Sequence, residues 1–157
     1  GWRVLQLPAV DFAPLRARTH RSPDVVLEHE RVATLPLPDG PCELELEIVH
    51  EGASTVELDF GSGHLRFRSL GHGASCELER TAGVVEDAGF AGRWHARREA
   101  ADAVLRVRVI LDACTCEIFV DDGAPTFSAL VFPADAPAPL RLRATGGAAR
   151  VAAVVHA

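Results

Sequence analysis

Length, composition and charge narrow the classes of protein to which this sequence can belong. A chain of 157 residues can form one domain with its own core, and a hydrophobic content of 48% is ordinary for a globular protein. The net charge of −6 is dispersed along the chain, which argues against nucleic acid as a partner. No apolar run approaches the roughly 20 residues that a membrane-spanning helix needs. The composition therefore predicts a globular domain that binds neither nucleic acid nor membranes.

The N-terminal stretch differs in character from the rest of the chain. Residues 1–18 include two prolines that interrupt regular structure. The stretch is also more apolar than a free tail needs to be, through Trp2, Leu5, Leu7 and Phe12 among others. We expect it to be a linker that packs against another domain, and we expect residues 19–157 to form a single domain.

From residue 25 onward the pattern is one of short strands and turns. Residues 42–48 alternate apolar side chains with Glu43, Glu45 and Glu47, which is the period of two of a half-buried strand. The three glutamates share one face of that strand, and we interpret this face as the solvated outer side of a sheet. Clusters of glycine and proline, such as residues 36–41, separate the strands.

Residues 94–102 form the one window with a helix-like pattern, and strands resume after it. Residues 105–133 predict three consecutive antiparallel strands, because apolar and polar side chains alternate in each. Asp122-Gly123 lies between the second and third strands and predicts a tight hairpin, since both turn positions favour positive φ. Pro133 ends the third strand because proline cannot donate a hydrogen bond to a sheet.

The fold class follows from this pattern. Short alternating strands, turn signals every 8–12 residues or so and almost no helix are typical of an all-β sandwich or barrel. Roughly ten to twelve strands are expected, which is enough for two packed sheets, and no propeller-like repeat is present. We therefore predict an all-β fold, a two-sheet antiparallel β-sandwich of the jelly-roll or concanavalin-like kind.

The four cysteines do not have the spacing of a zinc site. Cys114 and Cys116 are too close in sequence for easy bridging and lack a second pair, so we interpret the cysteines chiefly as buried free thiols. A disulfide between Cys42 and Cys76 stays open. Because the sequence starts at Gly1 without methionine, we expect it to be part of a longer protein, and its localisation, secreted or cytoplasmic, is open too.

One stretch resembles a known family. Residues 112–123, followed by residues 129–133, resemble the carboxy-terminal β-sandwich module of glycoside hydrolase family 32, which comprises invertases, levanases, inulinases and related fructosyl-processing enzymes. The positions that match the family pattern are Asp112, Glu117, Phe119, Gly123, Phe132 and Pro133. The positions that depart from it are Ala113, Cys114 and Asp121. Residues 5–16 are similar to the segment that joins the two domains of these enzymes.

The resemblance implies a partner and an absence of catalysis. Family 32 enzymes place catalysis in an N-terminal five-bladed propeller, on Asn-Asp-Pro-Asn, Arg-Asp-Pro and Glu-Cys stretches. None of these stretches occurs in this sequence. We therefore expect no catalytic residue in this chain, although the resemblance implies that its parent enzyme cleaves fructofuranosyl bonds in sucrose, levan or inulin with two carboxylates.

Few residues suggest a site of another kind. The histidines are dispersed and no phosphate-binding loop is present, so we expect neither a metal nor a cofactor. Sugar sites use aromatic faces with acids and arginines around them. The candidates are Trp94, Arg97, Asp121 and Asp122. Each has an ordinary structural alternative, because Trp94 can fill the sandwich edge and the two aspartates can simply form a turn before Gly123.

Two functional hypotheses result. The first is a non-catalytic module that stabilises the propeller of a fructan- or sucrose-processing hydrolase and can mediate homo-oligomerisation. The second is a module that binds a fructan such as levan or inulin. An independent enzyme is disfavoured, since the adjacent acids Asp121 and Asp122 would point to opposite faces of a strand and could not flank one bond.

Overall fold

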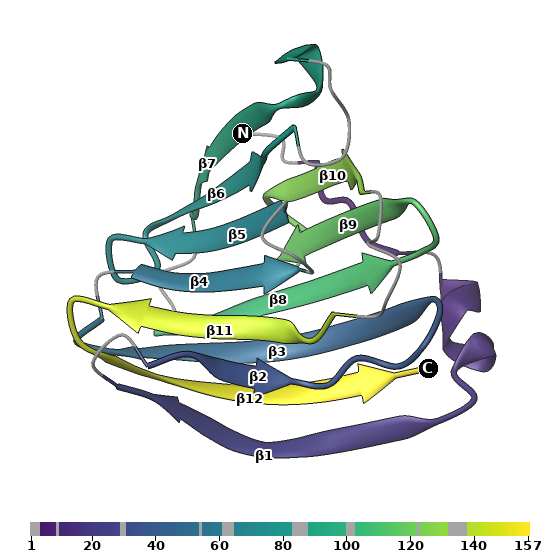
Figure 1. Ribbon diagram of the computed structural model, residues 1–157, viewed down its shortest axis with the longest axis horizontal. Coiled ribbons are helices and arrows are strands. Elements are labelled where there is room, and N and C mark those ends of the chain that lie inside the picture. Colours follow the sequence, from purple (N-terminus) through teal and green to yellow (C-terminus); the bar gives the residue numbers. More distant parts are fainter. Residues whose placement is uncertain are drawn as a thin grey trace.

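The protein is a sandwich of two sheets. The computed structural model describes residues 4–8, 10–28, 31–53, 55–60, 65–82, 88–99, 103–121, 123–131 and 138–157. In these ranges twelve strands form two six-stranded antiparallel sheets that face each other (Figure 1). The predicted all-β sandwich is thus confirmed. The described ranges contain no helix with the length and apolar character needed to cross a membrane.

The first sheet, called sheet A here, has the strand order β1-β12-β3-β8-β9-β10. Its strands are β1 (Thr19–Leu27), β3 (Cys42–Glu51), β8 (Val104–Leu111), β9 (Thr115–Val120), β10 (Thr126–Leu130) and β12 (Ala148–His156). The three consecutive strands predicted between residues 105 and 133 are its neighbours β8, β9 and β10. The long strand β1 lies at one edge and contains Pro23, which an edge strand tolerates.

The second sheet, called sheet B, has the strand order β2-β11-β4-β5-β6-β7. Its strands are β2 (Ala33–Leu35), β4 (Thr55–Phe60), β5 (Leu65–Leu70), β6 (Ser75–Arg80), β7 (Gly92–Arg97) and β11 (Leu140–Thr145). From β4 to β7 the strands follow one another along the chain as a meander. Strand β7 is the last of them and forms one edge of the sheet.

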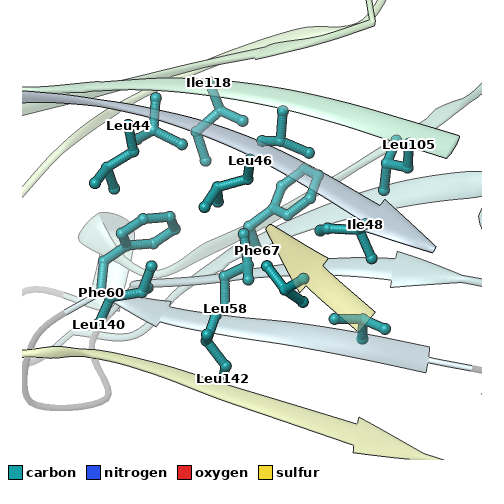
Figure 2. Close-up of a cluster of buried hydrophobic side chains, with 14 of the residues drawn as sticks. Leu44, Leu46, Ile48, Leu58, Phe60, Phe67, Leu105, Ile118, Leu140 and Leu142 are labelled. Carbon is teal, nitrogen blue, oxygen red and sulfur yellow. The ribbon is translucent and has the colours of Figure 1, made fainter. Parts of the chain in front are cut away.

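The core fills the space between the sheets because each strand turns its apolar set inward. In β3, Leu44, Leu46 and Ile48 are fully or almost fully buried, while the glutamates between them point to the outer face. Side chains from both sheets meet in this layer (Figure 2). Phe67 of sheet B and Phe127 of sheet A pack edge to face, with ring centroids 6.0 Å apart.

One local prediction was wrong and one was confirmed. Residues 94–97 of the helix-like window are strand and pair with β6 in an antiparallel register, and residues 100–102 lie outside the described residues. The predicted hairpin around Gly123 is present, since β9, which ends at Val120, pairs antiparallel with β10, which begins at Thr126. In that connection Asp121 and Gly123 have positive φ angles of 51° and 79°. Residue 122 and the predicted strand end at Pro133 lie outside the described residues.

All four cysteines are free thiols in the structure. Cys42, Cys76 and Cys116 are buried, whereas Cys114 is exposed between β8 and β9. The Cys42–Cys76 disulfide that the sequence left open is therefore not formed. Burial raises the pKa of the Cys42 thiol to about 11 and that of the Cys76 thiol to about 12. Both groups behave as apolar core residues.

Two short helices lie in the described ranges, and both are of the 3-10 type. The first, η1 (Val10–Leu15), precedes β1, and the second, η2 (Ala88–Phe90), lies between β6 and β7. Helix η1 belongs to the N-terminal segment, by which we mean the described residues 4–8 and 10–18. In Figure 1 this purple segment runs behind β10 and β9 and reaches η1 at the side of the sandwich.

Candidate functional site

Trp94, the predicted sugar platform, lies on the edge strand β7 and is 40% exposed. Its ring folds back over Gly92, where an added Cβ would come within 2.6 Å of the indole. The Arg80 guanidinium stacks on Phe90, 3.8 Å from the ring centroid, and lies 5.3 Å from the Trp94 centroid. Trp94 is therefore packed into the edge of the sandwich, and only part of its ring is open to a ligand.

Arg97 does not join Trp94. The two residues are three positions apart in one strand, so their side chains point to opposite faces of sheet B. Asp122 lies outside the described residues. Of the described candidates, Trp94 and Arg97 thus lie on different faces of sheet B.

Asp121 is held in an ion pair at the end of β9. Its carboxylate accepts two hydrogen bonds from Arg98, at 2.7 Å and 3.1 Å, and the Arg98 side chain is only 3% exposed. Arg98 also donates to the carbonyl of Val104 at 2.6 Å. This pair connects the end of β7 in sheet B to strands β8 and β9 in sheet A, so Asp121 has a structural role whatever else it binds.

Another polar pair, one member of which is half-buried and the other fully buried, connects the sheets near Arg98. His50 of β3 lies with Nδ1 3.0 Å from the carbonyl oxygen of Ala53 and with Nε2 2.9 Å from Oγ of Ser69 in β5. The carbonyl can only accept, so Nδ1 donates to it and neutral Nε2 accepts from the serine hydroxyl. Burial lowers the pKa of His50, as do the nearby charges of His72 and Arg98, although the carbonyl partly opposes the change. Ser69 is fully buried, which makes the pair a structural connection.

The outer face of sheet B carries an ion-pair network around Arg68. The Arg68 guanidinium contacts Glu57, Glu77 and Glu79 at 2.7, 2.8 and 2.7 Å. Arg93 and Arg143 add further pairs at its borders. Each of these glutamates thus lies against a guanidinium, and the network rigidifies the outer face of β4, β5 and β6.

Among the described residues the N-terminal segment is fastened to the sandwich at three places, the last of which is a set of backbone hydrogen bonds of Ala17 and Arg18 with Ala157. The backbone N–H of Gln6 donates to the carbonyl oxygen of Gly123 at 3.1 Å. The two backbones are so close that a Cβ on Gly123 would lie 1.8 Å from the backbone oxygen of Gln6. Farther along, Arg16 donates to both carboxylate oxygens of Glu43, at 2.7 and 2.9 Å, and to Glu45 at 2.9 Å. The segment is therefore a strap across sheet A.

The strap nevertheless leaves apolar side chains in solvent. Those that are exposed are Val4, Leu5, Leu7 and Leu15. Trp2 and the side chain of Phe12, which the sequence grouped with them, lie outside what the structure describes. The segment is thus tied down by polar contacts and turns apolar side chains outward.

Glu43 is the centre of the second fastening point. It is 8% exposed and accepts hydrogen bonds from Arg16 and Arg108. Burial alone would raise the pKa of Glu43, but the two guanidinium groups outweigh it and the pKa is lowered. Sequence reasoning treated this glutamate as solvated, because the pairing of distant residues 16 and 108 with β3 leaves no local signal.

Three possible metal ligands meet beside this point. Side-chain donor atoms of Glu43, Glu45 and His156 all lie within 4.8 Å of one another. His156 Nδ1 is 2.9 Å from the Thr19 hydroxyl, and Nε2 is 3.5 Å from Glu45. The guanidinium of Arg16 already bridges the two carboxylates, and so it occupies the position that a cation would take.

A groove of about 290 Å³ lies on the outer face of sheet A, and it was not predicted from the sequence. The charged residues that line it within the described part of the chain are Arg21, Glu45, Glu47, Arg106, Arg108 and Asp121. The sequence does contain the alternating glutamates of β3 and the alternating arginines of β8, but not the information that these strands are neighbours. Their register sets Glu45 opposite Arg108 and Glu47 opposite Arg106.

The sequence comparison identifies the module. Residues 42–157 match the family described as glycosyl hydrolases family 32 C terminal. The chain belongs to this family. The resemblance drawn from residues 112–133 is thereby confirmed, and the matched region extends from β3 to the end of the described sandwich. A comparison with curated proteins finds no match.

Solved structures agree in fold with this family 32 C-terminal module. An exo-inulinase from Aspergillus awamori superposes with a TM-score of 0.69 at 19% identity, over 90% of this chain and 29% of that one. Fructan 1-exohydrolase IIa from Cichorium intybus gives 0.73 at 11%, over 97% and 37%. Sucrose-6-phosphate hydrolase from Lactobacillus gasseri gives 0.68 at 13%, over 99% and 31%. The chain thus spans about a third of each of these proteins.

Proposed function

We propose that this chain is a non-catalytic accessory module of a fructan- or sucrose-processing glycosidase, and that it stabilises the catalytic propeller that precedes it. Membership of the C-terminal family supports the type of module. The similar solved structures are named as an inulinase, a fructan exohydrolase and a sucrose-6-phosphate hydrolase, which supports fructosyl substrates for the parent enzyme.

The observation that carries the proposal is the strap with its exposed apolar side chains. Val4, Leu7 and Leu15 are 82%, 63% and 73% exposed. A segment fixed by the Gln6–Gly123 and Arg16–Glu43 contacts cannot turn these groups into the core. Burying them against a neighbouring surface would stabilise the assembly by about 25 cal/mol per Å² of apolar area. We therefore assign residues 1–18 to the junction with the propeller, and residues 19–157 to the module.

Two carboxylates of the module, those of Glu43 and Glu79, are poorly suited to hydrolysis. A retaining glycosidase needs two carboxyl groups about 5 Å apart, one ionised as a nucleophile and one protonated as an acid. Glu43 and Glu79 are bonded to arginines that lower the pKa of each. Neither is therefore suited to be the acid. Incubating the chain with sucrose, inulin and levan should release no fructose, and release by the chain alone would contradict the proposal.

The stabilising role has a direct test. The domain encoded upstream of Gly1 is expressed without the module, and its thermal unfolding is followed with and without this chain added. We expect added chain to raise the midpoint in a concentration-dependent way, because a ligand that binds only the folded state stabilises it. An upstream region that encodes no glycosidase domain would overturn the proposal, as would an unchanged midpoint.

Variants of the strap and a control variant elsewhere on the surface show whether the strap contacts the catalytic domain. Leu7→Asp and Leu15→Asp change exposed residues of the strap, and Val26→Asp changes a residue of β1 that is also exposed. The strap variants should lose the stabilising effect, whereas the Val26 variant should keep it. Sedimentation of the same proteins tests the alternative that the strap mediates homo-oligomerisation. A dimer that dissociates only in the strap variants would favour self-association.

A further inference from the structure

The groove lies on the outer face of sheet A, the sheet that the strap crosses, and its lining is mostly charged. Two rows of outward side chains cross the sheet, because residues opposite one another in neighbouring antiparallel strands share a face. One row runs through Arg21, Val154, Glu45 and Arg108 in β1, β12, β3 and β8. The next row runs through Ala152, Glu47 and Arg106. These side chains line the groove of about 290 Å³.

The floor of the groove is apolar and is formed by short side chains. Ala152 and Val154 of β12 lie between the longer side chains of β1 on one side and of β3 and β8 on the other. Small side chains between long ones leave a depression in the sheet surface. Its floor offers C–H groups, and its walls offer charged ends.

The walls balance donors against acceptors. Among the described residues of the lining, Arg21, Arg106 and Arg108 supply three positive charges, and Glu45, Glu47 and Asp121 supply three negative charges, so these six charges balance at pH 7. Neighbouring ion pairs hold several of these groups in place. Arg16 contacts Glu45 at 2.9 Å, Arg98 contacts Asp121 at 2.7 Å, and Arg106 lies 3.6 Å from Glu47.

We propose that this groove binds one or two rings of an uncharged sugar chain. A sugar hydroxyl both donates and accepts, so a vicinal pair can accept from a guanidinium and donate to a carboxylate. The C–H face of the ring fits the apolar floor. The groove volume of about 290 Å³ lies just below the range for small-molecule sites, roughly 300–1,000 Å³, which suits a mono- or disaccharide unit. The inference goes beyond the proposed docking role and does not depend on it.

Charged ligands fit the groove less well. A phosphate group would face Glu45 and Glu47 as well as the arginines, and a divalent cation would face the three arginines. A nucleic acid needs a net positive surface, which this neutral lining is not. Of these ligand classes, an uncharged polyol is the one that can use both kinds of wall group, because its hydroxyls accept from the arginines and donate to the carboxylates.

The test is calorimetric titration of the chain with sucrose, inulin and levan. Glu47→Gln and Arg106→Gln remove one charge of each sign. Both side chains are more than half exposed, at 61% and 51%, so the variants should remain folded. We expect saturable binding by the unchanged chain and at least tenfold weaker binding by each variant. Trp94→Ala, at the edge of the other sheet, is the control and should bind as the unchanged chain does.

Each outcome decides the inference. No saturable binding by the unchanged chain would overturn it, as would full binding by both groove variants. Loss of binding in Trp94→Ala alone would move the sugar site to the edge strand β7. The same groove variants should still raise the unfolding midpoint of the catalytic domain, because the strap is intact. Failure of sugar binding is thus distinguishable from failure of the docking role.

Discussion

Replacing Gly123 by alanine should release the strap from sheet A. Gly123 has a φ angle of 79°, and its Cα faces the Gln6 carbonyl so closely that a Cβ would lie 1.8 Å from the oxygen. No rotamer relieves this contact, because both partners are backbone. The chain must move apart at this point, and the hydrogen bond from Gln6 to Gly123 is lost with it.

The loss of stability expected for Gly123→Ala has two parts. A left-handed conformation costs a residue with a Cβ about 1–2 kcal/mol. Losing the backbone hydrogen bond adds about 1 kcal/mol. Gly52→Ala is the matched control, because Gly52 has a φ angle of 86° and an added Cβ meets nothing within 4 Å. We therefore expect about 2–3 kcal/mol of destabilisation for Gly123→Ala and about 1–2 kcal/mol for the control.

Urea denaturation measures the two losses of stability, and trypsin reports on the strap. Cleavage after Arg16 should become faster in Gly123→Ala, because Arg16 is half-buried against Glu43 while the strap is in place. The control should be cleaved at the original rate. Equal destabilisation and equal cleavage of the two variants would refute the reasoning that the strap is fastened at Gly123.

Three further predictions concern the core, acid stability and the thiols. Phe67→Ala should lower the free energy of unfolding by about 3–5 kcal/mol in urea, since the ring is fully buried against Phe127. If the measured loss were smaller than the loss that Ile→Val substitutions usually cause, it would contradict the packing of Phe67 against Phe127. The lowered pKa of His50 keeps it neutral in the folded protein while the unfolded chain takes up a proton below about pH 6.5, so urea midpoints should fall between pH 7 and 5. His50→Gln should flatten that fall, and an unchanged slope would exclude this histidine as its source. Thiol titration at pH 8 should detect Cys114 alone in the native chain and all four thiols in urea, so a second fast thiol would contradict the burial of the others.

Local patterns were sufficient for much of the fold. The strands between residues 105 and 130 were predictable because alternation and turn residues are properties of neighbouring positions. The window from residue 94 was misread for the opposite reason. Its arginines and alanines favour a helix, but pairing with β6 overrides that preference. The family could be read from a few spaced residues, and the whole-domain match confirms it.

The candidate sites depended on contacts between distant residues. The pairing of β3 with β8 sets the two glutamates opposite two arginines, and no local pattern specifies which strands become neighbours. The packing of Trp94 on Gly92 and the ion pair of Asp121 with Arg98 likewise arise from the folded arrangement. The sequence was therefore sufficient to name residue types that suit a sugar. It was not sufficient to locate the groove, in which three arginines and three carboxylates lie together.

We propose that this module stabilises a catalytic domain through its strap. This stabilisation is measured by thermal unfolding of the domain encoded upstream of Gly1 with increasing amounts of this chain. We expect a midpoint that rises with the concentration of the unchanged chain and stays constant with the Leu7→Asp and Leu15→Asp variants. A midpoint that does not respond to the unchanged chain, or that rises equally with the strap variants, would contradict it.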